Sequence, residues 1–156
     1  ALGHRVVATD LAGALPVTRA NVEANRAAWA ATGGEVTARE LSFGDEDSAR
    51  ALGETDLVVA SDVAYDPAFF EPLRRSLRAI PGPWRALLAI SDRSDELGEE
   101  TFWNFCIDEG VPVACVFTAL VRDIDGTSAR RVNILELASS DLAAQARDEI
   151  DSDEQK

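Results

Sequence analysis

Four short apolar segments recur along the chain, with polar residues or turns between them. Residues 5–9 are rich in β-branched side chains, and residues 35–41 alternate between apolar and polar positions as a strand does. Residues 56–61 and 86–90 are nearly continuous apolar runs, the pattern of strands that are covered on both faces. The pattern therefore predicts four strands.

Amphipathic segments lie between these strands and predict helices. An imperfect apolar face runs over residues 16–29 and ends at the two glycines of 33–34. Residues 42–53 are expected to form a loop with a short helix. A further helix is expected over residues 66–80, because apolar residues recur there until the Pro-Gly-Pro segment 81–83 stops the helix.

The last third of the chain has a different pattern. Residues 94–109 carry apolar side chains on one helical face, which ends at a glycine. Residues 111–121 and 131–137 then predict two strands, joined as a β-hairpin around Asp125-Gly126. Beyond residue 138 the chain is polar and acidic.

Strands that alternate with helices and end in a hairpin predict an α/β layered sheet, mostly parallel with one antiparallel element. The sequence contains no internal repeat and no linker that would mark a second domain. We therefore expect one domain over residues 1–138, followed by an acidic tail over residues 139–156.

The chain is strongly acidic, with 15 Lys and Arg against 28 Asp and Glu and a net charge of −13. A field of this sign repels phosphate backbones and attracts basic partners, so nucleic acid is disfavoured; a purely solubilising role is the alternative. No run of about 18 apolar residues exists, so no membrane span is expected. Because the chain has no Met and no leader, we expect an excised domain or an incomplete record.

The two cysteines and the single histidine limit the chemistry further. Cys106 and Cys115 form no CxxC pair and lie in apolar surroundings, which predicts buried free thiols in a reducing compartment, the cytoplasm or nucleus. His4 is the only histidine, and we expect that it completes neither a metal cluster nor a His-based catalytic triad. We expect no metal site.

Ligands of parallel α/β sheets bind at the carboxyl ends of the strands, where this chain has four notable residues. Asp10 can accept hydrogen bonds from ribose hydroxyls, although Asp is also common at helix starts. Phe43 can lie against a nucleobase or tuck into the core. Asp62 and Tyr65 can aim a carboxylate and a phenol into one pocket, or form an ordinary turn.

Taken in order, the segments around these residues are similar to the lysine methyltransferase branch (methyltransferase family 16) of the S-adenosylmethionine-dependent methyltransferases. The matching segments are Val7-Ala8-Thr9-Asp10-Leu11, Asn21-Val22-Glu23-Ala24-Asn25, Leu41-Ser42-Phe43-Gly44 and Ala60-Ser61-Asp62-Val63-Ala64-Tyr65. The resemblance runs from residue 2 to about residue 137 and includes the family's Asp-x-x-Tyr motif. In two respects the chain departs from the family: Phe43 replaces a usual tryptophan, and the Gly-rich first strand and turn are absent.

The resemblance implies a Rossmann-like seven-strand sheet of order 3-2-1-4-5-7-6 with a C-terminal antiparallel hairpin. The first strand, at its centre, would be missing from this chain. Residues 5–9 would form strand two and residues 56–61 strand four, so we expect these two either to leave a space between them or to pair directly.

The resemblance also implies S-adenosylmethionine as cofactor and assigns roles to six residues. Asp10, with Leu11 beside it, would hold the ribose hydroxyls, Phe43 would face the adenine, and Ser61 would line the same pocket. Asp62 and Tyr65 would act at the site where the target lysine meets the methyl group.

These features predict a protein-lysine N-methyltransferase whose partner is a protein that bears the target lysine. One alternative is another class I methyltransferase that acts on a different side chain or on a small molecule. A second alternative is a nicotinamide-dependent Rossmann oxidoreductase, because that class also has an acidic residue after the second strand. A non-catalytic interaction module remains a further alternative, because the Gly-rich segment is absent.

Overall fold

A computed structural model of the chain describes residues 3–91, 100–122 and 129–139. The predicted strands and most predicted helices are present, whereas the turn at 125–126, the helix start at 94–99 and the tail from residue 140 lie outside the described residues. The elements follow the order β1 (Arg5–Asp10), α1 (Leu15–Ala24), α2 (Arg26–Ala30), β2 (Glu35–Glu40), α3 (Glu46–Arg50), β3 (Leu57–Ser61), η1 (Pro67–Phe69), α4 (Phe70–Ala79), β4 (Arg85–Ser91), α6 (Phe102–Asp108), β5 (Val113–Arg122) and β6 (Ala129–Ala138).

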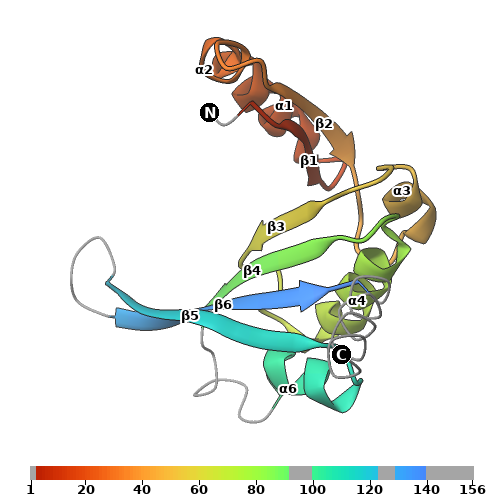
Figure 1. The fold of residues 1–156 in the computed structure, drawn as a ribbon, viewed down its shortest axis with the longest axis vertical. Coiled ribbons are helices and arrows are strands. Elements are labelled where there is room, and N and C mark those ends of the chain that lie inside the picture. Colours follow the sequence, from red (N-terminus) through yellow and green to blue (C-terminus); the bar gives the residue numbers. More distant parts are fainter. Residues whose placement is uncertain (1–2, 92–99, 123–128, 140–156) are drawn as a thin grey trace, which may run out of the picture.

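The described strands form two sheets (Figure 1). β1 and β2 pair in parallel, and the second sheet has the order β3-β4-β6-β5, with β3 parallel to β4 and the β5–β6 hairpin antiparallel. The mixed α/β fold with one antiparallel hairpin is therefore confirmed. β1 and β3 do not pair, and no strand lies between them in the part of the chain that the structure describes.

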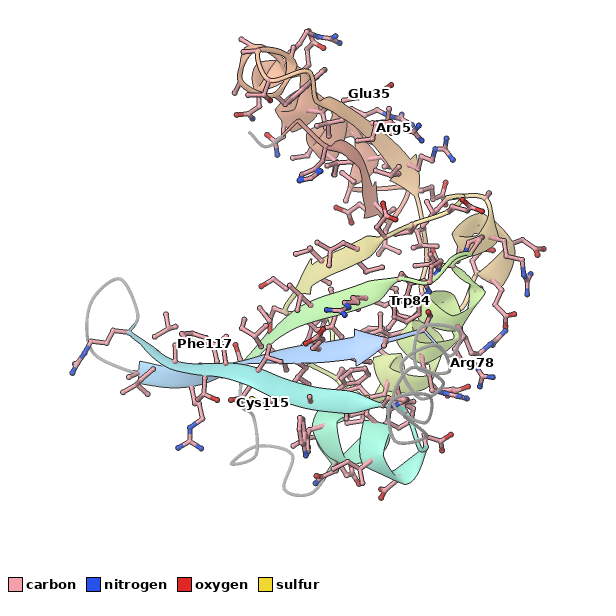
Figure 2. All side chains as sticks on the ribbon, in the orientation of Figure 1. Arg5, Glu35, Arg78, Trp84, Cys115 and Phe117 are labelled. Atoms are coloured by element: carbon pink, nitrogen blue, oxygen red, sulfur yellow. The ribbon has the colours of Figure 1, made fainter. Side chains whose placement is uncertain are left out.

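The core lies on one face of the four-stranded sheet, where α4 and α6 pack against β4 and β6. Ala86 and Leu88 of β4 have no exposed surface, and Trp84 is buried just before that strand (Figure 2). The buried cluster comprises Leu41, Ala49, Ala64, Phe70, Leu73, Leu77, Ile80, Trp84, Ala86, Leu88, Phe102, Cys106, Leu135 and Leu137. Three phenylalanines join the two helices, since the Phe70 ring lies 5.4 Å from that of Phe102 and 5.7 Å from that of Phe105.

The expectation that residues 56–61 are covered on both faces is wrong. Val58 and Ala60 pack against the core, but Leu57 is 51% exposed and Val59 is 71% exposed. In β4, likewise, Ala86 and Leu88 are buried while Leu87 lies on the less covered face. The reason is that the described helices beside this sheet contribute their apolar side chains to one face only.

The helix expected over residues 16–29 is divided in two, with Asn25 between α1 and α2. The Asn25 side-chain amide donates to the Asn21 carbonyl at 2.8 Å, and its backbone leaves the helical region at φ −98° and ψ 7°. A side chain that binds a nearby carbonyl competes with regular helical bonding, which explains the break.

The expectation that both cysteines are buried is confirmed for Cys106 and wrong for Cys115. Cys106 is buried beneath α4, and burial raises the pKa of its thiol to about 12. Cys115 is a free, exposed thiol on β5. Its strand is the outermost of its sheet and has an irregular register between Cys115 and Phe117, so the local apolar sequence does not bring burial.

Candidate functional site

Asp10 is the last residue of β1 and lies at the carboxyl end of the small parallel sheet. It pairs with Glu40 in the β1–β2 register, and its carbonyl accepts a hydrogen bond from the Leu41 backbone N–H at 2.9 Å. One carboxylate oxygen accepts from the Leu11 N–H at 2.9 Å, and the other accepts from the Thr18 hydroxyl at 3.3 Å. These bonds fix the orientation of a partly exposed carboxylate.

Phe43 lies in the loop that follows β2, and its ring is 37% exposed. The loop is fastened to α4 because the Gly44 N–H donates to the Ser76 hydroxyl at 2.8 Å. Gly44 has a φ of +91°, a conformation that favours glycine. Just beyond the loop, Glu46 accepts a hydrogen bond from Arg75 of α4 at 2.9 Å. Phe43 therefore lies on a short loop whose following residues, Gly44 and Glu46, are hydrogen-bonded to α4.

The chain turns sharply where β3 ends. Ser61 is the last residue of the strand, and the Asp62 N–H extends the ladder by donating to the Ala89 carbonyl at 2.9 Å. Asp62 has a φ of +54° and is the one non-glycine residue with positive φ in the described ranges. Such left-handed residues cost energy and concentrate at functional sites, although Asp tolerates the region better than most. Ala64, 3% exposed, anchors the turn in the core.

Tyr65 projects from this turn and is 48% exposed. Its ring meets that of Phe69 edge-on, with centroids 5.3 Å apart. The Asp66 carboxylate begins η1 by accepting from the Ala68 N–H at 2.9 Å. The Tyr65 ring is therefore held against Phe69, three residues after Asp62 along the chain, with part of its surface open.

The six predicted residues fall into two groups. Asp10, Leu11 and Phe43 lie at the ends of β1 and β2, whereas Ser61, Asp62 and Tyr65 lie at the end of β3. The two groups belong to different sheets, and α4 connects them. This helix follows the Asp62–Tyr65 turn and η1, and its Ser76 holds the Phe43 loop.

Sequence reasoning missed the residues that orient this site. Thr18 steadies Asp10 and Ser76 holds the Phe43 loop, yet both are single hydroxyl residues within helices. Thr18 could have been found from the sequence, because it lies in the first turn of the helix that follows Asp10, close to the end of the strand. Ser76 lies 32 residues from Gly44, and nothing in the sequence links them.

A groove of about 400 Å³ was also missed. It is lined by Pro67, Phe70, Glu100, Thr101, Phe105 and Asp108. Its walls come from the segment directly after Tyr65 and from α6, which are distant in sequence. Aromatic rings and two carboxylates together form a surface suited to a basic side chain.

No group of three or more His, Cys, Asp or Glu side chains capable of holding a metal ion occurs in residues 3–91, 100–122 and 129–139. Within the same ranges, no helix is long and apolar enough to cross a membrane.

Comparison with known protein families identifies the chain. The model of a family described as lysine methyltransferase matches residues 2–106, which is more than half of the chain. The chain therefore belongs to the lysine methyltransferase family and is a class I, S-adenosylmethionine-dependent methyltransferase.

Among solved structures, the chain is similar to precorrin 8W decarboxylase, the product of gene MT0146 of Methanobacterium thermoautotrophicum. The two are 18% identical, with a TM-score of 0.44, and the match covers 86% of this chain and 68% of that one. No curated protein matches the chain.

Proposed function

We propose that this methyltransferase transfers a methyl group from S-adenosylmethionine to the side-chain amine of a lysine in a protein substrate. The observation that supports the proposal best is the turn at the end of β3, where Asp62 adopts a left-handed conformation beside the exposed ring of Tyr65. The matched family model supports the same chemistry.

The cofactor side of the proposed site is assigned to Asp10, Leu11, Phe43 and Ser61. Each oxygen of the Asp10 carboxylate accepts one hydrogen bond and retains capacity for another, so it can accept two ribose hydroxyls. The open face of Phe43 fits an adenine ring, and Leu11, 58% exposed, adds apolar surface next to the ribose position. These donor and acceptor types fit the nucleoside half of S-adenosylmethionine.

Asp62 and Tyr65 are assigned to the acceptor lysine. When bound, S-adenosylmethionine supplies an activated methyl group, so the protein has mainly to orient the amine in line with it and exclude water. A free lysine has a pKa of about 10.4, and the ammonium must lose its proton before it can attack. The Asp62 carboxylate and the Tyr65 ring can hold the cationic amine in position until that loss.

The acidic surface supports a basic protein substrate. The chain carries a net charge of −13, which increases the encounter rate with positively charged partners. The groove adds the carboxylates of Glu100 and Asp108, and it is also lined by Pro67, two residues after Tyr65. A lysine-bearing segment can therefore be drawn to this side of the proposed site.

A further parallel strand between β1 and β3 belongs to this proposal. In the described part of the chain, β1 pairs only with β2, and β3 pairs only with β4. Each therefore has one edge without a strand, a costly arrangement if it is buried without partners. The separate pairings β1-β2 and β3-β4-β6-β5 are compatible with the order 3-2-1-4-5-7-6 that the family resemblance implies, if a further strand lies between β1 and β3. We assign residues 1–138 to the methyltransferase domain and 139–156 to an acidic tail.

The test measures methyl transfer to lysine-rich proteins by mass spectrometry, using the longest natural polypeptide that contains residues 1–156. Asp62→Asn retains a residue that tolerates positive φ but removes the charge, and Tyr65→Phe removes the phenol oxygen alone. Both variants should lower turnover while the affinity for S-adenosylhomocysteine stays close to that of the wild type.

Asp47→Asn is the matched control, because the Asp47 side chain is 97% exposed on α3. It should leave both turnover and affinity unchanged. Methylation of a nucleotide or a small molecule, with none on protein lysine, would refute the proposed substrate class. Loss of cofactor affinity in both site variants would refute the roles assigned to Asp62 and Tyr65.

A further inference from the structure

Among the described residues, no strand pairs with the outer edge of β5. β5 is the last strand of the β3-β4-β6-β5 sheet and pairs with β6 alone in the described part of the chain (Figure 1). Its ten residues are twice as many as those of β3, the strand at the other edge. Backbone N–H and C=O groups that face away from β6 are therefore available to a further strand.

The sequence of β5 lacks the features that usually protect an edge. It reads Val-Ala-Cys-Val-Phe-Thr-Ala-Leu-Val-Arg, with no proline and with Arg122 as its one charged residue. This is unusual in a chain of which 28% is charged. Long apolar edges of this kind pair readily with other chains, so proteins normally interrupt them with charges or proline.

Exposed apolar side chains are concentrated on the same strand. Val116 is 49% exposed, Phe117 60%, Leu120 68% and Val121 50%. The register irregularity between Cys115 and Phe117 interrupts the inner ladder, but the pairs from Phe117 to Arg122 are continuous. Six consecutive residues thus combine a regular backbone with apolar side chains on both faces.

Charge favours a second copy of this chain as the partner. Three arginines and one glutamate lie on the described hairpin strands, namely Arg122, Arg130, Arg131 and Glu136. Two acidic residues precede β5 instead: Asp108 ends α6, and Glu109, 3.9 Å from Arg74, follows it. If two β5 strands run antiparallel with their centres aligned, Arg122 of each copy lies opposite Val113 of the other, the end of the strand that follows Glu109. Such pairing also satisfies the self-complementary symmetry of a two-fold dimer.

We propose that β5 is a homodimerisation edge, at which two copies join antiparallel to form one continuous eight-stranded sheet. The interface consists of main-chain hydrogen bonds between the two β5 strands, with Phe117, Leu120 and Val121 packing across the junction. The edge lies at the opposite end of the sheet from β3, which carries Asp62 and Tyr65 at its carboxyl end.

The test combines sedimentation equilibrium with hydrogen exchange on the full 156-residue chain. The chain should form a concentration-dependent dimer, and amide exchange in β5 should slow as the dimer forms while exchange in β3 stays unchanged. Leu120→Lys removes exposed apolar surface from the junction and places a charge on each edge, so it should weaken dimerisation at least about tenfold. Arg122→Glu should weaken it as well.

The matched controls are Val17→Lys and Arg19→Glu, both on α1. Val17 is 65% exposed, close to the exposure of Leu120, so a change there tests the effect of a surface lysine without touching the edge. Both controls should dimerise like the wild type. A chain that stays monomeric at high concentration would overturn the proposal. So would a dimer that protects β3 rather than β5, or one that Leu120→Lys does not weaken.

Discussion

Replacing Ser76 by alanine tests whether the Phe43 loop depends on the hydrogen bond between Gly44 and α4. Ser76 is 2% exposed, and its hydroxyl accepts the Gly44 N–H at 2.8 Å. Alanine keeps the helix and nearly all of the volume but removes the acceptor. The part-buried Gly44 N–H then faces a methyl group instead of an acceptor. The loop also packs against Pro72, whose Cβ lies 3.6 Å from the position that a Cβ on Gly44 would take.

Two opposing effects set the magnitude. A buried donor left without an acceptor costs about 1–3 kcal/mol. Ser76 lies inside α4, where alanine is the better helix former by about 0.5 kcal/mol. The net loss of unfolding free energy should therefore be about 0.5–2.5 kcal/mol, which for a chain of this size lowers the melting temperature by about 1–10 °C.

Urea denaturation of Ser76→Ala and of the wild type provides the measurement, with stability compared at equal m-values. The control is Ser48→Ala in α3, whose hydroxyl donates to Asp45 at 2.6 Å but in an exposed position. Its lost bond and its gain in helix propensity should roughly cancel. An unchanged or increased stability of Ser76→Ala would refute the reasoning, because it would mean that the loop finds another acceptor without cost.

Three further outcomes are expected. In the longest natural polypeptide containing residues 1–156, Asp10→Ala should weaken S-adenosylhomocysteine binding by about 1.5–3 kcal/mol in calorimetry, the range for hydrogen bonds to a charged group; unchanged affinity would remove the ribose role. The 156-residue chain, in whose described part no strand lies between β1 and β3, should show no measurable methyl transfer, and micromolar binding of S-adenosylmethionine would contradict this. Native protein at about pH 8 should be alkylated at Cys115 and not at Cys106, because burial raises the pKa of the Cys106 thiol to about 12 and limits reagent access; mass spectrometry before and after denaturation gives the comparison.

Much of the secondary structure could be predicted from the sequence because local patterns determine it. Residues 5–9, 35–41, 56–61 and 86–90 all became strands within one or two residues of the expected bounds. The terminal hairpin followed from two apolar segments close together in sequence, which pair as β5 and β6. The strand-end residues were also found, since the end of a strand is a local property.

Tertiary contacts explain what could not be predicted. An apolar run such as 56–61 does not reveal whether one face or two will be covered, and Val59 lies on the uncovered side. Cys115 lies in an apolar segment as Cys106 does, but only Cys106 is buried in the core cluster. The groove between Pro67 and Phe105 and the bond from Gly44 to Ser76 join residues that are far apart in the chain.

Because the backbone at Asp62 is left-handed, substitutions there should rank differently by folding and by turnover, two rankings that usually agree in a mutational scan. Glycine and asparagine reach a φ of +54° easily, so they should be the best tolerated replacements for folding, whereas β-branched residues should be the worst. Glutamate keeps the negative charge but is disfavoured by the backbone, so it should fold less well than asparagine. At this position, abundance in a cell and turnover in an assay should therefore follow different orders of amino acids, and a library scored only for expression would select variants without the carboxylate.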